Sequence, residues 1–314
     1  MLVIEAERFG GPEVLRVKRV PDPRPGPGQL VVEAKVTGVL SIDAVIRRGE
    51  AGQLFPVSPP YVPGAGAAGQ VAEIGAGVDS EWCGAWVLAD VDGGGYAEKV
   101  LATPDQLIRI PAGVGLREAM ALLHDGATAL AVFERVDVHP GETVLVQPAG
   151  GGLGSLLVQL AHHAGARVIG AARGAAKLET VRALGAEVVV DYSEPGWMSE
   201  AGPVDVAFDG VGGELGRAAA ELVVAGGRYS NYGFAGGAPV PAAEVARRGV
   251  TAYGLDQLHD YAPQRRARAE RMLELAARGT VRTLIGQTFP LSRAADAHRA
   301  LESRAATGKT LLVI

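Results

Sequence analysis

One stretch near the middle of the chain restricts the fold more than any other. Thr143–Ala149 (TVLVQPA) is an apolar run typical of a β-strand, and it leads into the glycine cluster AGGGLG (149–154), an A-x-G-x-x-G pattern. The segment that follows predicts a helix packed on a sheet, because apolar residues recur at helical spacing. They stand at offsets 0, 3, 4, 7, 8 and 11, at Leu153, Leu156, Leu157, Leu160, Ala161 and Ala164. A strand, a glycine turn and a helix in this order predict a βαβ unit.

The glycine turn itself predicts a ligand. Glycines allow the backbone to turn sharply and to approach a pyrophosphate, whose charge is stabilised by the N–H groups at the helix N-terminus. We therefore predict that a dinucleotide is bound by Ala149, Gly150, Gly151, Gly152, Leu153 and Gly154. The alternative is a glycine-rich strand–helix turn without a ligand.

The type of dinucleotide depends on the end of the next predicted strand, Arg167–Ala172. An NAD site places an Asp or Glu about 20 residues after the glycine pattern, where it accepts hydrogen bonds from the ribose 2′-hydroxyl. No acidic residue occurs between Gly150 and Lys177, and the stretch at 171–177 reads AARGAAK. Arg173 and Lys177 suit a 2′-phosphate, so we predict NADPH as the cofactor. The alternative is a solvated, basic helix start.

The texture of the chain changes at about residue 120. Before it, short β-type runs such as Leu30–Val36 and Trp86–Val91 are separated by Gly- and Pro-rich turns, which predicts a mainly β domain. After it, strands alternate with helices, which predicts an α/β fold with a doubly wound parallel sheet. We place this sheet in residues 119–258. The last segment, 259–314, is too small to stand alone, so we expect it to fold back onto residues 1–118.

Composition excludes several classes of function. With 30 Lys and Arg against 35 Asp and Glu, the formal net charge is −5, so we expect neither a nucleic-acid partner nor a membrane partner. The one cysteine, Cys83, cannot form an internal disulfide or a cysteine-rich zinc site. The first residues, MLVIEAERFG, do not contain a basic segment followed by an apolar one, so we expect no secretory signal. No apolar run reaches the length of a membrane span. We expect a soluble, cytoplasmic protein.

Several motifs follow one another in the order of a known family. They are FGGPEVL near the start, GVLSIDAVIRRG (38–49), VPGAGAAGQVAEIGAGV (62–78), GGGYAEKV (93–100), GETVLVQPAGGGLGSLLVQLA (141–161), VDVAFDGVGG (204–213), GGRYSNYG (226–233) and FPLSRAADAHRALESRAATGK (289–309). With these motifs spread over nearly its whole length, the chain resembles the zinc-free quinone oxidoreductase branch of the medium-chain dehydrogenase/reductase superfamily.

The resemblance implies a GroES-like, mainly β substrate domain built from both termini and a central Rossmann domain that binds NADPH. It also implies a homodimer. The residues that it assigns to the cofactor are the 149–154 turn, Arg173, Lys177, Tyr192, Gly210, Val211 and Gly233. The Tyr192 hydroxyl would touch the 2′-phosphate, whereas Gly210, Val211 and Gly233 would lie along the nicotinamide ribose.

Three residues are candidates for catalytic roles, each with a plainer alternative. Asp43 is retained from the family pattern G-V-N-x-x-D, although its role there can be limited to orienting backbone. Tyr61 could donate a proton, and the alternative is ordinary loop packing. Thr128 is a family-like cofactor contact, and the alternative is a capping or turn role.

The chain departs from the family at two polar positions and at the zinc ligands. Leu40 stands where relatives commonly have Asn, and Gly66 where they have Glu. These changes make the pocket more apolar and predict an apolar small-molecule substrate, but they leave the proton donor unnamed. The Cys residues and the His-Glu pair of zinc-dependent relatives have no counterpart, so we predict that no metal is bound.

Two classes of function remain open. The first is an NADPH-dependent oxidoreductase that transfers hydride to a quinone or an α,β-unsaturated carbonyl compound, including the variant of a specialised biosynthetic reductase or reductive cyclase. The second is a protein that holds NADPH as a sensor with little turnover. Both agree with the glycine turn, and the two lost polar positions favour the second.

The stretch Gly249–Leu255 (GVTAYGL) predicts the last strand of the central sheet, because it holds β-branched and aromatic residues without proline. An edge strand of this kind must be covered or paired. In the family resembled, two such edges meet across a twofold axis. The alternative is a monomer whose edge is shielded by the basic helix that follows.

Overall fold

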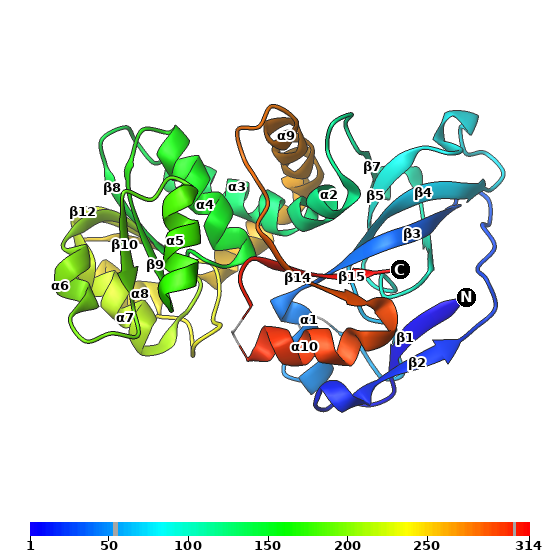
Figure 1. The fold of residues 1–314 in the computed structure, drawn as a ribbon, viewed down its shortest axis with the longest axis horizontal. Helices are drawn as coiled ribbons and strands as arrows, with labels where there is room; N and C mark the ends of the chain where they lie inside the picture. The colour runs from blue at the N-terminus through cyan, green and yellow to red at the C-terminus, as the bar shows by residue number, and fades with distance from the viewer. Residues whose placement is uncertain (53–55, 304–305) are drawn as a thin grey trace. The chain divides into compact units, whose positions relative to one another are not determined.

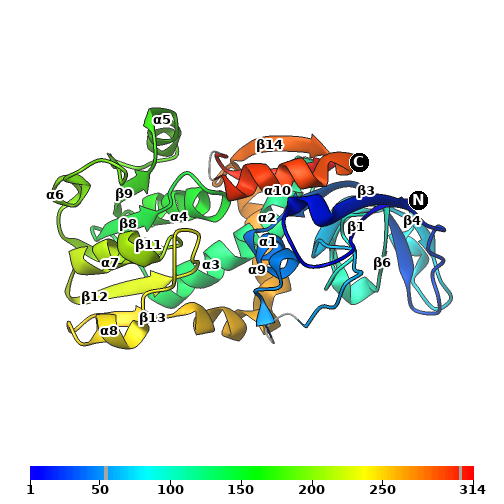
Figure 2. The ribbon, with the colours of Figure 1, turned by 90° about the horizontal axis from the view of Figure 1, so that it is seen from below.

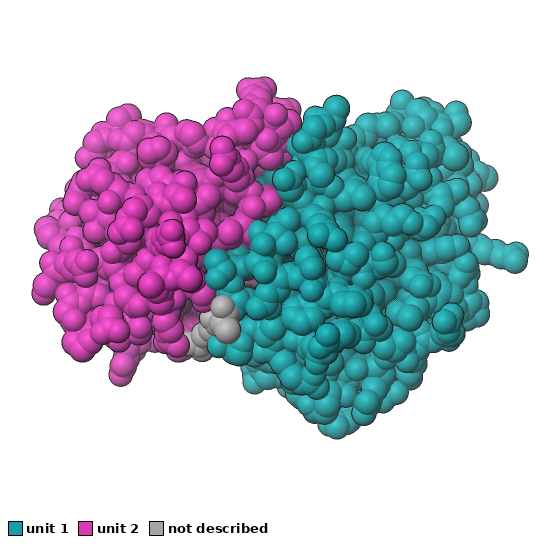
Figure 3. Space-filling model, in the orientation of Figure 1, with its two compact units in different colours: residues 1–123, 285–314 teal, residues 124–284 magenta. Residues whose placement is uncertain are grey.

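The structure is a computed structural model that describes residues 1–52, 56–303 and 306–314. The chain divides into two compact units, coloured separately in Figure 3. Unit 1 combines Met1–Leu123 with Ile285–Ile314, and unit 2 is the continuous segment His124–Leu284. Each unit has its own sheet and its own core.

Unit 1 is built on a seven-stranded sheet in which strands from both ends of the chain pair (Figure 1). The order is β14-β15-β3-β4-β5-β7, with β6 also paired to β3, while β1 and β2 form a separate two-stranded sheet. The bounds are β1 Leu2–Ala6, β2 Leu15–Arg19, β3 Leu30–Val39, β4 Gly66–Ile74, β5 Trp86–Asp90, β6 Lys99–Ala102, β7 Leu107–Arg109, β14 Ile285–Pro290 and β15 Lys309–Val313. The helices are α1 Ser41–Arg48, α2 Leu116–Leu123 and α10 Ala294–Glu302, with 3₁₀ turns at Pro12–Val14, Ser80–Trp82, Pro104–Gln106 and Leu291–Arg293.

The C-terminal strand completes the N-terminal sheet. β15 runs antiparallel to β3, with Thr310 opposite Val39 and Val313 opposite Val36. The buried aliphatic residues of β3, among them Leu30 and Val32, form a core with β4, β5 and β6. β14 and β15 of the last segment thus belong to the same sheet as the N-terminal strand β3.

Unit 2 is a six-stranded sheet whose strands all run parallel. The order is β10-β9-β8-β11-β12-β13, so the direction of winding reverses between β8 and β11. The strands are β8 Thr143–Gln147, β9 Arg167–Ala172, β10 Val188–Asp191, β11 Val204–Asp209, β12 Val223–Asn231 and β13 Thr251–Tyr253. The helices are α3 Asp125–Val136, α4 Gly152–His163, α5 Ala175–Ala183, α6 Trp197–Ala201, α7 Gly213–Leu222, α8 Ala242–Ala246 and α9 Arg265–Ala277, with a 3₁₀ segment at Leu255–Gln264. In such a sheet, ligands bind at the carboxyl ends of the strands beside the reversal.

Helices cover both faces of this sheet (Figures 1 and 2). Side chains of α6, α7 and α8 pack with Leu145, Ile169 and Ala207 on one face. On the other face α3, α4 and α5 pack, and the Phe133 and Phe208 rings stack at 6.4 Å between centroids. α4 is buried nearly all round rather than along one stripe, because α3 covers the side of α4 that does not face the sheet.

The limits of the two units differ from those expected from the sequence. The predicted central domain was 119–258, whereas the second unit spans His124–Leu284. The second unit extends further towards the C-terminus because it includes α9, which packs against α3. The Gln159 side chain also holds the segment after α9, because its Nε2 donates to the Arg282 carbonyl (3.0 Å) and its Oε1 accepts from the Arg282 N–H (2.8 Å).

Two expectations concern the outer surfaces. β13 is the edge strand beside β12, as predicted for the stretch Gly249–Leu255. Over the described part of the chain, the helices are too short or too polar to cross a bilayer.

Candidate functional site

The glycine turn lies at the carboxyl end of β8, beside the reversal of the sheet. β8 ends at Gln147, the Gln147–Pro148 peptide is cis, and α4 begins at Gly152 with Gly151 as its N-cap. The Ala149 N–H donates to the Ala171 carbonyl at 2.9 Å and ties the turn to β9. The first N–H groups of a helix have no partner within the helix, so α4 directs donors at whatever occupies the turn. The structure therefore gives the six residues 149–154 the strand–turn–helix context predicted for them.

Two glycines of the turn lie close to other parts of the chain. A Cβ on Gly154 would lie 2.1 Å from the Pro148 carbonyl oxygen, so the first turn of α4 packs directly on the backbone. A Cβ on Gly150 would lie 3.3 Å from the Lys177 Cβ. The aliphatic part of Lys177 thus rests against the turn.

Arg173 and Lys177 stand at the corner between β9 and α5. Arg173 is exposed and Lys177 is half-buried. Partial burial lowers the pKa of Lys177, and the nearby positive charge of Arg173 lowers it further. Two cations held near each other beside a helix N-terminus form a site for an anion of more than one charge. This arrangement agrees with the predicted 2′-phosphate site.

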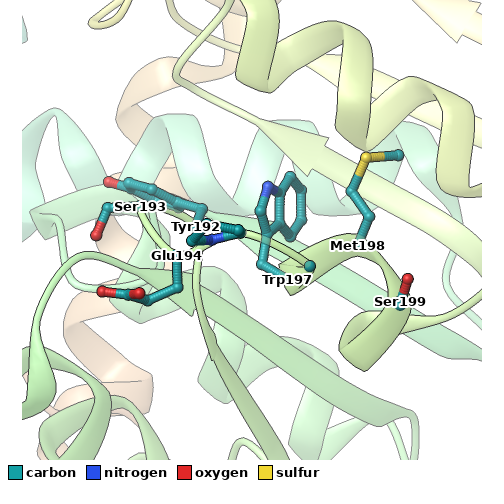
Figure 4. Close-up of a pocket in the computed structure, with 8 residues that line it drawn as sticks. Tyr192, Ser193, Glu194, Trp197, Met198 and Ser199 are labelled. Carbon is teal, nitrogen blue, oxygen red and sulfur yellow. The ribbon is translucent and has the colours of Figure 1, made fainter.

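Tyr192 begins the segment that follows the neighbouring strand, β10. Its N–H donates to the Ala172 carbonyl at 3.3 Å, which brings the ends of β9 and β10 together. The ring lies at one end of an open hollow lined by residues 192–199, with the Tyr192 hydroxyl directed away from Trp197 (Figure 4). The structure therefore places Tyr192 next to the strand end that leads into Arg173.

Sequence analysis missed a carboxylate at this corner. Asp191, the last residue of β10, accepts the Gly174 N–H on Oδ2 (2.7 Å) and the Ser193 N–H and hydroxyl on Oδ1 (2.9 and 2.5 Å). Burial alone would raise the pKa of Asp191, but the hydrogen bonds from Ser193 and Gly174 and the charge of Arg173 hold it below its usual value. Both oxygens are used within the chain, so the carboxylate shapes the corner. Asp191 lies outside the stretch 150–177 that was considered for an acidic residue, because it comes from the next strand, β10.

The turns after β11 and β12 pack against each other and bring the remaining cofactor residues together. The Ala235 N–H donates to the Gly210 carbonyl (3.1 Å) and the Gly236 N–H to the Val211 carbonyl (2.6 Å). A Cβ on Gly233 would lie 2.9 Å from the Gly210 carbonyl oxygen, so the backbones meet there without side chains between them. The role of Gly210, Val211 and Gly233 along the nicotinamide ribose stays a prediction.

Thr128 lies in the first turn of α3, in unit 2. It is half-buried, and its N–H donates to the His124 carbonyl at 2.9 Å. His124 is the N-cap residue, although its side chain makes no capping hydrogen bond. These contacts account for the backbone of Thr128, and a role for its hydroxyl stays a prediction.

The other candidates, Asp43 and Tyr61, lie in unit 1, where Asp43 begins a chain of buried polar groups. Asp43 Oδ2 accepts the Leu40 N–H at the start of α1 (2.8 Å) and the Tyr96 hydroxyl (3.1 Å). Tyr96 Oη lies 3.1 Å from His298 Nε2, and His298 Nδ1 lies 3.0 Å from Arg47 Nη1. Tyr96, His298 and Arg47 are fully buried. The carboxylate of Asp43 thus holds backbone and anchors α10 to α1.

The direction of these hydrogen bonds follows from arginine, which only donates. Arg47 donates to Nδ1 of His298, so the proton of the neutral imidazole is on Nε2 and is donated to Tyr96, which donates to Asp43. Arg47 also donates to Glu302 Oε1 at 2.7 Å. Sequence analysis did not connect His298 with Tyr96, because the two residues meet only through the fold.

Tyr61 is fixed by its backbone, which exchanges hydrogen bonds with Ala6 in both directions (2.8 and 3.2 Å). Its hydroxyl oxygen is buried and has no hydrogen-bond partner among the residues that the structure describes. Burial, and then the charge of Asp43, raise the pKa of Tyr61 to about 12. Tyr61 therefore keeps its proton at neutral pH, as a proton donor must.

The buried histidine predicts a pH dependence of stability. Burial, and then the charge of Arg47, lower the pKa of His298 from 6.5 to about 3. Between these values the unfolded chain binds a proton that the folded chain excludes, so stability is full above about pH 6.5 and falls as the pH drops towards 3. The contribution is about 1.4 kcal/mol per pH unit at most.

Urea unfolding of the wild type and of His298→Gln between pH 7 and pH 5 measures this contribution. Glutamine offers one acceptor to Arg47 and one donor to Tyr96 but does not titrate. The free energy of unfolding should fall more steeply with acid in the wild type. Equal slopes in the two proteins would show that His298 binds a proton as readily in the folded as in the unfolded state.

Both units match described protein families. Residues 26–112 match the alcohol dehydrogenase GroES-like domain, and residues 184–312 match a family described as zinc-binding dehydrogenase. The predicted fold, a GroES-like mainly β domain with a Rossmann doubly wound sheet, is confirmed by these matches and by the two sheets.

Similar proteins cover the whole chain. A quinone oxidoreductase of Pseudomonas aeruginosa is 29% identical over 99% of this chain and 98% of its own length. A probable quinone oxidoreductase of Schizosaccharomyces pombe is 30% identical over 99% and 97%. A 2-haloacrylate reductase of a Burkholderia species is 29% identical over 97% and 96%.

Solved structures give the same picture. A mycobacterial protein in complex with NADPH superposes with a TM-score of 0.88 at 30% identity, and the match covers 100% of both chains. The quinone oxidoreductase of Escherichia coli in complex with NADPH superposes with a TM-score of 0.85 at 27% identity, again over 100% of both chains.

Proposed function

Since the chain belongs to the quinone oxidoreductase branch of the medium-chain dehydrogenase/reductase superfamily, we propose that it is an NADPH-dependent oxidoreductase acting on quinones or α,β-unsaturated carbonyl compounds. The observation that supports this function most is the corner beside the glycine turn. There Lys177 rests against Gly150, Arg173 is near enough to lower the pKa of Lys177, and Tyr192 follows the neighbouring strand. Two relatives in complex with NADPH support the same cofactor.

The residues of unit 2 bind and orient the cofactor. NADPH, when bound, would supply a hydride from its nicotinamide ring to the acceptor. The N–H groups at the start of α4 would hold the pyrophosphate, and Arg173 and Lys177 the 2′-phosphate. The backbone of Gly210, Val211 and Gly233 would line the ribose next to the nicotinamide. Because the glycines carry no Cβ, the cofactor can approach the strand ends closely.

Reduction of an enone also needs a proton after the hydride. We assign its donation to Tyr61 rather than Asp43. Tyr61 carries a proton at neutral pH, as tyrosines do, and its hydroxyl has no partner within the described residues. The Asp43 carboxylate already accepts the Leu40 N–H and the Tyr96 hydroxyl, which suits a positioning role.

The proposed substrate is apolar and carries an activated double bond or a quinone ring. Leu40 and Gly66 stand where relatives have polar side chains, so these positions offer no polar side chain to a substrate. The name of the Burkholderia relative specifies 2-haloacrylate, whose double bond is conjugated to a carboxylate. That relative supports reduction of activated double bonds as a reaction class.

Steady-state NADPH oxidation against a panel of quinones and enones tests this function. We expect turnover with apolar members of the panel and little with polar ones. Tight NADPH binding without turnover on any acceptor would contradict the proposal and favour an NADPH sensor.

We propose that the protein works without a zinc ion, although one matched family is described as zinc-binding. In the described ranges no three His, Cys, Asp or Glu side chains gather in a group that could hold a metal ion, and Cys83 is exposed. We therefore expect that a chelator leaves activity and the melting temperature unchanged. Stoichiometric zinc in protein purified without a tag, by elemental analysis, would contradict this.

We further propose that the protein is a homodimer that pairs through β13. The outer edge of β13 has no neighbouring strand in the sheet as described, and unpaired edges favour association. Ala252→Pro removes an N–H at the centre of β13 and should shift the dimer towards monomer in light scattering. Ala246→Pro, in the nearby helix α8, controls for proline itself. A monomer mass for the wild type at micromolar concentration would reject the dimer.

A further inference from the structure

Asp209 is a fully buried carboxylate at the carboxyl end of β11, in the middle of the sheet. Its Oδ1 accepts hydrogen bonds from Gln147 Nε2 (2.9 Å) and the Val211 N–H (2.8 Å). Its Oδ2 accepts from the Tyr229 hydroxyl (2.7 Å) and Asn231 Nδ2 (3.0 Å). The Gly212 N–H lies 3.2 Å from both oxygens.

These partners lie in, or on the strands that lead into, the three turns that the proposed function assigns to the cofactor. Gln147 is the last residue of β8, directly before the glycine turn. Val211 lies in the turn after β11. Asn231 ends β12 and also donates to the Gly233 carbonyl at 2.9 Å. One carboxylate therefore fixes the three turns relative to one another.

The shell around Asp209 is neutral. All five partner groups donate, from two amides, two backbone N–H groups and one phenol. Among the residues described, no Lys, Arg or His forms an ion pair with this carboxylate. A buried charge without a cation is costly, and its field is weakly screened by its surroundings.

The phenol of Tyr229 is suited to remain a donor in this shell. Burial of Tyr229, and then the charge of Asp209, raise the pKa of its hydroxyl far above the usual value. The same two causes raise the pKa of Tyr232, whose hydroxyl donates to the Gln147 carbonyl at 3.0 Å. The negative charge of Asp209 thus acts on both phenols, Tyr229 and Tyr232.

We propose that Asp209 is a positioning residue of the cofactor site whose uncompensated charge favours the oxidised over the reduced nicotinamide. This inference rests on the proposed function, which places the nicotinamide end beside residues 210, 211 and 233. The reduced ring is neutral. When a hydride leaves with its two electrons for the acceptor, the ring becomes positively charged, and a buried negative charge stabilises that form.

The ratio of the dissociation constants of NADP⁺ and NADPH isolates this effect. The two forms carry the same phosphates and differ in the charge of the ring, so a loss of turn geometry weakens both, whereas a loss of charge changes the ratio. In Asp209→Asn, titration calorimetry without an acceptor should show the ratio Kd(NADP⁺)/Kd(NADPH) rising by about threefold to tenfold.

Asp205→Asn is the matched control. Asp205 lies on the same strand at its amino end, is half-buried, and accepts the Thr143 N–H at 2.8 Å. The substitution removes the same charge from the opposite end of the same strand. It should leave the ratio at the wild-type value.

Tyr229→Phe supplies an independent variant that keeps the carboxylate. Removing one donor leaves the charge less screened, so the ratio should fall below the wild-type value. The inference would be overturned if Tyr229→Phe left Kd(NADP⁺)/Kd(NADPH) unchanged while Asp209→Asn either left this ratio unchanged or did not fold. The titration contains no acceptor and is independent of turnover. A failure to oxidise NADPH in the separate panel of quinones and enones would reject the proposed function and leave this result standing. A wild type that binds neither form would reject both.

Discussion

Replacing Arg173 with alanine is expected to weaken NADPH binding roughly tenfold to a hundredfold and to leave NADH binding nearly unchanged. Arg173 and Lys177 flank one corner, where burial, and then the positive charge of Arg173, lower the pKa of Lys177. A 2′-phosphate relieves this repulsion by accepting charge-assisted hydrogen bonds, each of which contributes about 1.5–3 kcal/mol. NADH has no phosphate at that position and loses none of these contacts.

Fluorescence titration with each cofactor measures this effect, and Arg167→Ala is the control. Arg167 is an exposed arginine at the amino end of β9, where it pairs with Glu187 at 3.1 Å, so its removal changes the net charge by the same amount. Equal affinity of the wild type for NADPH and NADH would contradict the assignment of the corner. So would an equal loss of both in Arg173→Ala.

Replacing Gly154 with alanine is expected to destabilise unit 2 by about 1–3 kcal/mol or more, even without cofactor. The added Cβ would lie 2.1 Å from the Pro148 carbonyl oxygen, far inside van der Waals contact. The obstacle is backbone, so α4 must move away from the end of β8. Movement there also displaces the N–H groups that would hold the pyrophosphate, so affinity for the cofactor should fall with stability.

Thermal and urea unfolding of the protein without cofactor measure this effect, with Gly151→Ala as the matched control. Gly151 has φ −85° and ψ 170°, which alanine adopts readily, and its Cβ would lie 3.5 Å from the Pro148 oxygen. That variant should lose at most about 1 kcal/mol, because alanine is a poorer N-cap residue than glycine. Equal stability of the two variants would show that the turn is not tightly packed.

The sequence predicted the parts of the fold that depend on local pattern. The strand Arg167–Ala172 has the predicted limits, because the apolar runs of a parallel sheet are bounded by clear turn residues. α4 was predicted with a single apolar stripe and is buried nearly all round. Its second buried side depends on α3, and periodicity within one segment does not reveal a neighbour.

The candidate site was predictable where its residues follow one strand and not where strands meet. The glycine turn, Arg173 and Lys177 were found because they follow two successive strands of one βαβ unit. Asp191 was missed because it accepts the Gly174 N–H of another segment. Asp209 was missed because its side-chain donors come from β8 and β12. Such contacts leave no spacing signal in the sequence.

The polar chain in unit 1 was missed for the same reason. Asp43, Tyr96 and His298 come from three distant segments and meet only in the folded unit. Each residue belongs to a separate motif that was noted in the sequence. The connection between the motifs is tertiary.

The fate of the transferred hydrogen tests the central claim most directly. NADPH carrying deuterium at C4 of the nicotinamide would be oxidised by the enzyme with an apolar enone, and the product examined by mass spectrometry and NMR. Hydride transfer predicts one deuterium at the β carbon of the product and a solvent proton at the α carbon. Oxidation of the deuterated NADPH without deuterium in the product, or no reduced product at all, would contradict the proposed reaction.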